Sequence, residues 1–173
     1  GDFANQDLSA DDLAAAIQNG HAYTTWHERY RKRDNFILGQ HLALDFDTDD
    51  EQSTFEHLLQ DNFIRQYASF LHTTPSHTPE TPRARVVFEL DRPIANADKY
   101  TLLATALVHR FGGADSSCKD SARLFFGAPG CEIHHLGNVL RLEDAARELV
   151  NPYKEYRQAQ RDAARERMKN REV

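Results

Sequence analysis

The chain has 173 residues, of which 40% are hydrophobic and 28% are charged, and its formal net charge is −6. These values place it among globular chains with one hydrophobic core. Its apolar runs are too short to span a membrane, its first residues lack a secretory signal, and two cysteines exclude a disulfide framework. We therefore expect a reducing, cytoplasmic compartment. Because no Met begins the chain, we also expect a piece of a longer protein.

Caps, alternation and helical spacing predict that strands and helices alternate along the chain. Ser9 is expected to cap a first helix that ends at Asn19-Gly20. The strands expected after it are 42–46, 68–73, 85–90 and 123–126, and the helices are 53–60, 97–111 and 142–150. Three prolines make 74–82 a loop, and Pro152 is expected to break the chain before a charged, helix-favouring stretch.

This order predicts an α+β fold, an α/β sandwich in which helices cover a sheet. We expect a catalytic domain over residues 1–152 and a charged helical tail over residues 153–173, which links to a further region. The tail has seven basic and four acidic residues, a net charge of +3. Since the whole chain carries −6, residues 1–152 carry a net charge of −9.

Asp45 and Asp47 lie at the end of the strand expected over 42–46. Side chains two apart share a strand face, so both carboxylates point away from the apolar face of that strand. Adjacent carboxylates repel each other unless a cation lies between them, and their oxygens suit Mg²⁺ or Mn²⁺. The pattern predicts a divalent-metal site, and its alternative is a strand that simply runs into an acidic loop.

Ser76 and His77 lie in the proline-rich loop that follows. A hydroxyl and an imidazole there can hold phosphate oxygens. Arg83 and Arg85 follow on one face of the next strand, where two guanidiniums can bind a triphosphate. The alternative is an ordinary polar loop beside an edge strand.

A third acidic segment follows the helix expected over 97–111. Asp115 can complete a three-carboxylate metal site, and Asp120 is the competing choice. Arg123 enters the next expected strand and can contact triphosphate or template. Asp and Ser are also common in turns, so a structural turn is the alternative.

Two other patterns are not favoured. Cys118, Cys131, His134 and His135 lack the paired close spacing of zinc motifs, so zinc is not expected. The Gly-rich pieces are not followed by Gly-Lys-Ser/Thr, so they do not form a Walker loop.

Together the three segments resemble the archaeo-eukaryotic primase superfamily, especially the primase-polymerases of phages, plasmids and related mobile elements. The family's motifs resemble, in order, residues 42–47 (LALDFD), Ser76-His77 with 82–88, and Ala114-Asp115 with 120–126. The resemblance covers about residues 35–130 and lies in the combination of motifs. Here Ser and His are adjacent, whereas the family often places one residue between them.

The resemblance implies an RRM-like palm joined to a second αβ unit, with the catalytic site between them. It implies a two-metal site for Mg²⁺ or Mn²⁺ held by Asp45, Asp47 and Asp115, with His77 also catalytic. It implies an incoming NTP or dNTP held by Ser76, His77, Arg83, Arg85 and Arg123.

The implied activity is template-directed nucleotidyl transfer in the replication of a mobile element or a related system. Its partners would be a single-stranded DNA template and primer, with a helicase or other domain C-terminal in the full-length protein and no membrane. Two alternatives stay open. A metal-dependent nuclease or phosphohydrolase would use the same carboxylates, and a non-catalytic nucleic-acid-binding, RRM-like module would keep them as a relic.

Overall fold

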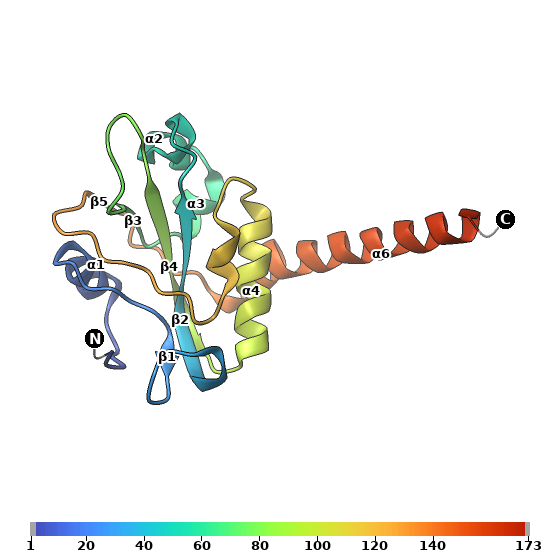
Figure 1. The fold of residues 1–173 in the computed structure, drawn as a ribbon, viewed down its shortest axis with the longest axis horizontal. Helices are drawn as coiled ribbons and strands as arrows, with labels where there is room; N and C mark the ends of the chain where they lie inside the picture. The colour runs from blue at the N-terminus through green and yellow to red at the C-terminus, as the bar shows by residue number, and fades with distance from the viewer. Residues whose placement is uncertain (1–2, 172–173) are drawn as a thin grey trace.

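A five-stranded sheet lies at the centre of the computed structural model, which describes residues 3–171 (Figure 1). Its strand order is β1-β2-β4-β3-β5, and all paired neighbours are antiparallel. The strands are β1 (Trp26–His27), β2 (Phe36–Phe46), β3 (Phe70–Thr73), β4 (Ala84–Ile94) and β5 (Ile133–His135). The helices are α1 (Ala10–Gln18), α2 (Phe55–Leu58), α3 (Asn62–Tyr67), α4 (Ala97–Arg110), α5 (Leu142–Ala145) and α6 (Asn151–Arg171). The mixed α+β class agrees with the sequence-based expectation.

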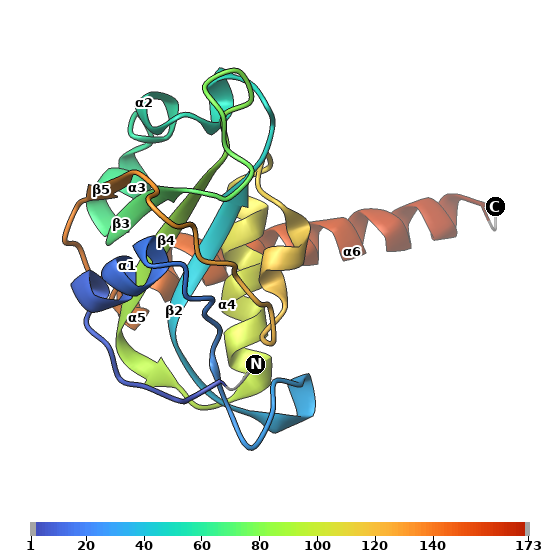
Figure 2. The ribbon, with the colours of Figure 1, turned by 60° about the vertical axis from the view of Figure 1, so that its left-hand side comes forward.

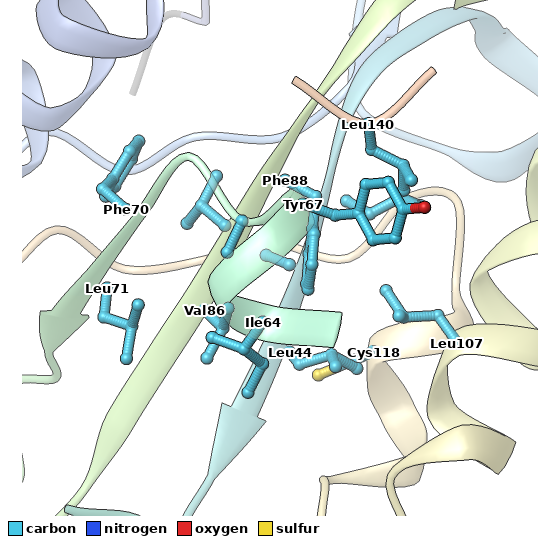
Figure 3. Packing of buried hydrophobic residues seen from close by; sticks show 14 of the residues in the cluster. Leu44, Ile64, Tyr67, Phe70, Leu71, Val86, Phe88, Leu107, Cys118 and Leu140 are labelled. Atoms are coloured by element: carbon cyan, nitrogen blue, oxygen red, sulfur yellow. The ribbon is translucent and has the colours of Figure 1, made fainter. Parts of the chain in front are cut away.

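One face of the sheet forms the main core. Leu44 of β2 lies opposite Val86 of β4, which in turn lies opposite Leu71 of β3. Ile64 of α3 and Leu107 of α4 pack over this row, and all five side chains are fully buried (Figure 3). Burying each such side chain contributes about 1.5–3 kcal/mol.

The opposite face of the sheet is covered by α1 and by the segment that passes through Phe125 (Figure 2). Ser9 Oγ accepts the Asp12 N–H and starts α1 where the sequence predicts it. Gly20 follows the helix with a positive φ of 91°. Gly127 lies so close to the Gly20 backbone that a Cβ would collide with it. This close approach ties the Phe125 segment to the end of α1.

Two expectations from the sequence are wrong. The strand expected over 123–126 is absent, and in this segment only Phe125 pairs, with Tyr23. Arg123 closes a turn by donating to the Asp120 carbonyl, and Gly127 begins the approach to α1, so little extended chain remains between them. The break expected at Pro152 is also absent.

At Pro152 the chain continues from α5 through a π-helical turn, Ala146–Val150, directly into α6. Proline lacks an N–H and its ring clashes with the carbonyl four residues earlier. The wider π turn immediately before it accommodates both defects. The expected charged helix is therefore confirmed, but it begins without a break.

Along its described length, α6 has no buried residue, and it projects away from the body of the fold (Figures 1 and 2). At its root, Tyr153 and Tyr156 pack against His109 of α4, with ring centroids 5.3 and 4.4 Å from that of His109. Among the described residues, no helix has both the length and the apolar character needed to cross a membrane.

Candidate metal and nucleotide site

A buried ion pair joins the two central strands. Asp45 of β2 lies opposite Arg85 of β4, and Arg85 Nε donates to Asp45 Oδ1 at 2.6 Å. The two residues are only 8% and 5% exposed, so water screens the pair weakly. Arg85 also donates to the Phe126 carbonyl at 3.0 Å and lies over the Phe125 ring, 4.7 Å from its centroid. Asp45 is thus held by charge on the sheet face opposite the main core.

Asp115 reaches the same place from the loop after α4. Ala114 forms a bridge with Phe46 at the edge of β2, and the Asp115 N–H donates to the Asp45 carbonyl at 2.9 Å. Asp115 Oδ1 accepts the N–H and the hydroxyl of Ser117, at 2.9 and 2.8 Å. Burial acts to raise the Asp115 pKa, but these bonds and the Arg123 charge outweigh it and lower the pKa. The side chain is therefore a carboxylate at neutral pH.

Arg123 lies between the two carboxylates. Its Nη2 is 3.5 Å from Asp45 Oδ2 and 3.3 Å from Asp115 Oδ2. Its Nε is buried and finds no hydrogen-bond partner among residues 3–171. A buried N–H without a partner is costly, so this group would gain from an acceptor oxygen if one came within its reach.

Cys118 completes a cluster with Asp45 and Asp115, in which one ligand atom from each residue lies within 4.8 Å of the others. The Cys118 Sγ accepts the Asp45 N–H at 3.3 Å. Burial, followed by the Asp45 charge, raises the pKa of this thiol to about 12, so it is protonated at neutral pH in the metal-free chain. The two carboxylates offer hard oxygen donors, and the cluster of Asp45, Asp115 and Cys118 could hold a metal ion.

The other two candidate carboxylates lie outside this cluster. Asp47 is exposed, one residue beyond the end of β2. Asp120 Oδ1 accepts from Arg33 Nε at 3.1 Å and from the Ala122 N–H at 2.9 Å. The structure thus brings Asp45 and Asp115 together.

The Ser76-His77 loop connects the end of β3, which carries His72, to the start of β4, which carries Arg85. His77 Nδ1 accepts the Arg83 N–H at 3.0 Å, so in the neutral ring the proton is on Nε2, which is a donor. Ser76 is exposed. Arg83 forms an ion pair with Asp49, Nε to Oδ1 at 2.8 Å, and both side chains are partly exposed.

A family model of the VapE N-terminal domain matches residues 18–159, most of the chain. The chain belongs to the VapE N-terminal domain family. This family is associated with phages and plasmids. No curated protein and no solved structure matches the chain. The matched range contains every candidate site residue and ends inside α6.

In this VapE N-terminal domain, sequence reasoning missed a second layer around Arg85. His72 of β3 lies opposite Arg85, and its Nε2 is 3.4 Å from the Tyr23 hydroxyl. Burial raises the Tyr23 pKa to about 12, and burial together with the Arg85 charge lowers the His72 pKa to about 4. Both side chains are therefore neutral at pH 7 and leave Asp45 as the anion beside Arg85. Only the strand register reveals this layer, since neither residue belongs to a recognisable motif.

Proposed function

We propose that this VapE N-terminal domain is the catalytic domain of a primase-polymerase, which transfers nucleotides to a primer on a single-stranded DNA template. The observation that carries the proposal is the meeting of Asp45 and Asp115, which are far apart in the sequence, beneath Arg123. This arrangement supplies two hard oxygen donors and one cation at a single point, as metal-dependent phosphoryl transfer requires.

The order of elements supports an RRM-like palm. The chain runs β2, α2 and α3, β3, β4, α4 and then the segment at Ala114, a β-α-β-β-α-β order. The Ala114 segment, β2, β4 and β3 are successive neighbours. We assign α1 and the Phe125 segment to the second unit, because they cover the face that carries Asp45 and Arg85.

The side chains at the site have separate roles in this proposal. Asp45 and Asp115 would hold Mg²⁺ or Mn²⁺, which when bound supplies positive charge to the attacking hydroxyl and the transferring phosphate. Arg123 would turn its unpartnered Nε–H to a phosphate oxygen of the NTP or dNTP. His77, with its proton on Nε2, would donate to another phosphate oxygen from the loop after β3. Arg83 and Ser76 would contact the nucleotide at the exposed rim, and Asp47 would reach the site only if the loop after β2 moved.

A non-catalytic nucleic-acid-binding module is the second candidate, and one observation favours it. Arg85 and Arg123 already balance the charges of Asp45 and Asp115, so the two carboxylates are stable together without an ion. In that case the network holds the Ala114 segment against β2 and has no chemical role.

Primer extension with Mn²⁺ tests the proposal, and Asp115→Asn is the informative variant. Asp45 is unsuitable, because its loss would leave Arg85 buried without its ion-pair partner. Asp120→Asn is a matched control, since Asp120 also caps a short turn and pairs with one arginine. The two side chains are similarly exposed, at 29% and 35%.

We expect extension by the unaltered chain and by Asp120→Asn, and loss of extension in Asp115→Asn with the fold retained by circular dichroism. Extension that persists in Asp115→Asn would overturn the assignment of this site. A labelled primer that shortens would identify a nuclease. Calorimetry without any heat of Mn²⁺ or nucleotide binding, together with no extension, would favour the non-catalytic module.

A further inference from the structure

A row of basic side chains runs along one side of α6. Arg157, Arg161, Arg165 and Lys169 follow at four-residue intervals, and Lys154 lies one turn earlier. At about 100° per residue, the five fall within about 120° of the helix circumference. We call these five residues the basic row. All of them are exposed, and none forms an ion pair with another residue in the described part of the chain.

Like charges outnumber opposite charges among the neighbouring charged pairs of α6. Opposite charges four residues apart stabilise a helix, and like charges at that spacing destabilise it. In α6 the charged pairs at this spacing are Arg157–Arg161, Arg161–Arg165, Arg165–Lys169, Arg167–Arg171 and Asp162–Glu166. Every pair at this spacing joins like charges, whereas at three-residue spacing Asp162–Arg165 and Glu166–Lys169 join opposite charges. A helix that served only as a solvated spacer would gain from more opposite pairs, so the gathering of five cations on one side of α6 points to a partner of opposite charge.

The position of α6 leaves the row open to a large partner. The helix projects away from the sheet and its covering helices (Figures 1 and 2). At its root, a groove of about 570 Å³ is lined by Leu102 of α4 and by residues of α6. These are three members of the row, Lys154, Arg157 and Arg161, together with Tyr153, Gln158 and one acidic residue, Glu155. The row therefore begins in a groove beside the body and continues along the free helix.

The composition of α6 argues against two other partners. A second copy of α6 would need an apolar seam, but its larger apolar side chains are only Tyr153, Tyr156 and Met168. A membrane-surface helix would need bulky apolar residues opposite its cations, and the opposite side here carries Ala159, Ala163 and Arg167.

We propose that the basic row of α6 binds the sugar–phosphate backbone of nucleic acid. Closely spaced, unpaired guanidiniums on an exposed helix suit successive phosphates, and such binding does not depend on base sequence. The inference does not rest on catalysis at the carboxylate site. In this proposal the basic helix α6 holds the nucleic-acid strand, and the acidic body of the domain carries the carboxylate site.

Two double variants of the same helix test the row. Arg161→Ala/Arg165→Ala removes two members of the row, and Arg167→Ala/Arg171→Ala removes two arginines from outside it, with the same change in net charge. All four side chains are exposed, so both variants should fold, as circular dichroism would verify. Binding of a fluorescein-labelled oligothymidylate is followed by anisotropy over a range of KCl concentrations, without divalent ions or nucleotide.

We expect the row variant to bind more weakly, with a plot of log K against log salt that is shallower by about 1.4, or about 0.7 for each lost phosphate contact on a single strand. The control should keep the slope of the unaltered chain. Equal losses in both variants, or an unchanged slope in the row variant, would overturn the proposal. Row-dependent binding to phosphatidylserine vesicles without binding to the oligonucleotide would overturn it in favour of a membrane.

The same measurement in the Asp115→Asn background separates this proposal from the catalytic one. Retained oligonucleotide binding with loss of primer extension would support the row and the catalytic site together. Loss of oligonucleotide binding in Asp115→Asn would overturn the claim that binding by the basic row is independent of the carboxylate site.

Discussion

The buried pair of Asp45 and Arg85 predicts a large difference between removing one partner and replacing both. In Asp45→Ala, the Arg85 guanidinium, which is 5% exposed in the unaltered chain, would lose its only carboxylate partner among residues 3–171 and keep neutral neighbours, the Phe126 carbonyl and the Tyr23 hydroxyl. Breaking a buried pair in this way costs about 3–5 kcal/mol. Arg123 would lose one contact as well, but it is partly exposed and keeps Asp115, so this loss adds little.

Replacing both partners by apolar side chains removes the stranded charge. Asp45→Leu combined with Arg85→Met should therefore be near neutral, within about 1 kcal/mol, because buried pairs contribute little net stability. Urea unfolding followed by circular dichroism measures both effects. With a slope of about 2 kcal/mol per molar urea, Asp45→Ala should lower the midpoint by about 2 M.

A complete double-mutant cycle makes the result decisive. It compares Asp45→Leu, Arg85→Met and the combined variant with the unaltered chain. A midpoint shift below about 0.5 M for Asp45→Ala would refute the view that Arg85 is left without compensation. A double variant as unstable as Asp45→Leu alone would refute the claim that charge, and not packing, dominates at this position.

Three further outcomes follow from buried groups and from one close contact. Burial lowers the pKa of His41 and of His72 to about 4, below the usual 6.5. The unfolded chain therefore binds protons at a higher pH than the folded chain does. The free energy of unfolding should fall as the pH drops from about 6.5 to about 4. Urea midpoints across this window check the trend: His72→Gln should flatten it, and a constant midpoint for the unaltered chain would contradict it. Because burial raises the Cys118 pKa to about 12, iodoacetamide at pH 8 should modify this thiol only as fast as the protein unfolds, and rapid alkylation of the native chain would show that the site is open. Gly127→Ala should cost about 1–3 kcal/mol in urea unfolding, because its Cβ would collide with the backbone of the Gly20 turn. Gly112→Ala, where a Cβ meets nothing within 4 Å, should be near neutral, and equal effects would exclude the collision as the cause.

Local signals predicted the longer elements of the fold. The Ser9 cap placed α1, and alternation placed the central parts of β2 and β4. The shortest elements, β1 with two residues and β5 with three, carry too few positions for any period to appear. Pro152 does not end the helix, because a wider π-helical turn before it accommodates the proline, and nothing in the local sequence indicates such a turn.

The site was predictable only in part, since its geometry depends on register and loop path. Alternation put Asp45 and Arg85 on the same side of their strands, but only the pairing of β2 with β4 makes them direct partners. Nothing local indicates that the chain after α4 returns to the edge of β2 and brings Asp115, and with it Cys118, against Asp45. The choice between Asp115 and Asp120 was open for the same reason.

The π-helical turn before α6 determines the rotational phase of that helix. Each residue added to or removed from a continuous helix rotates everything beyond it by about 100°. The π-helical turn at Ala146–Val150 therefore determines which side of α6 the basic row occupies relative to the carboxylate site, although this turn lies outside the row. A one-residue deletion in this turn would preserve every charge and every spacing in α6 and yet aim the row elsewhere. A nucleic-acid strand that contacts only α6 would bind as before. A nucleic-acid strand that must also reach Asp115 would no longer be aligned with that residue.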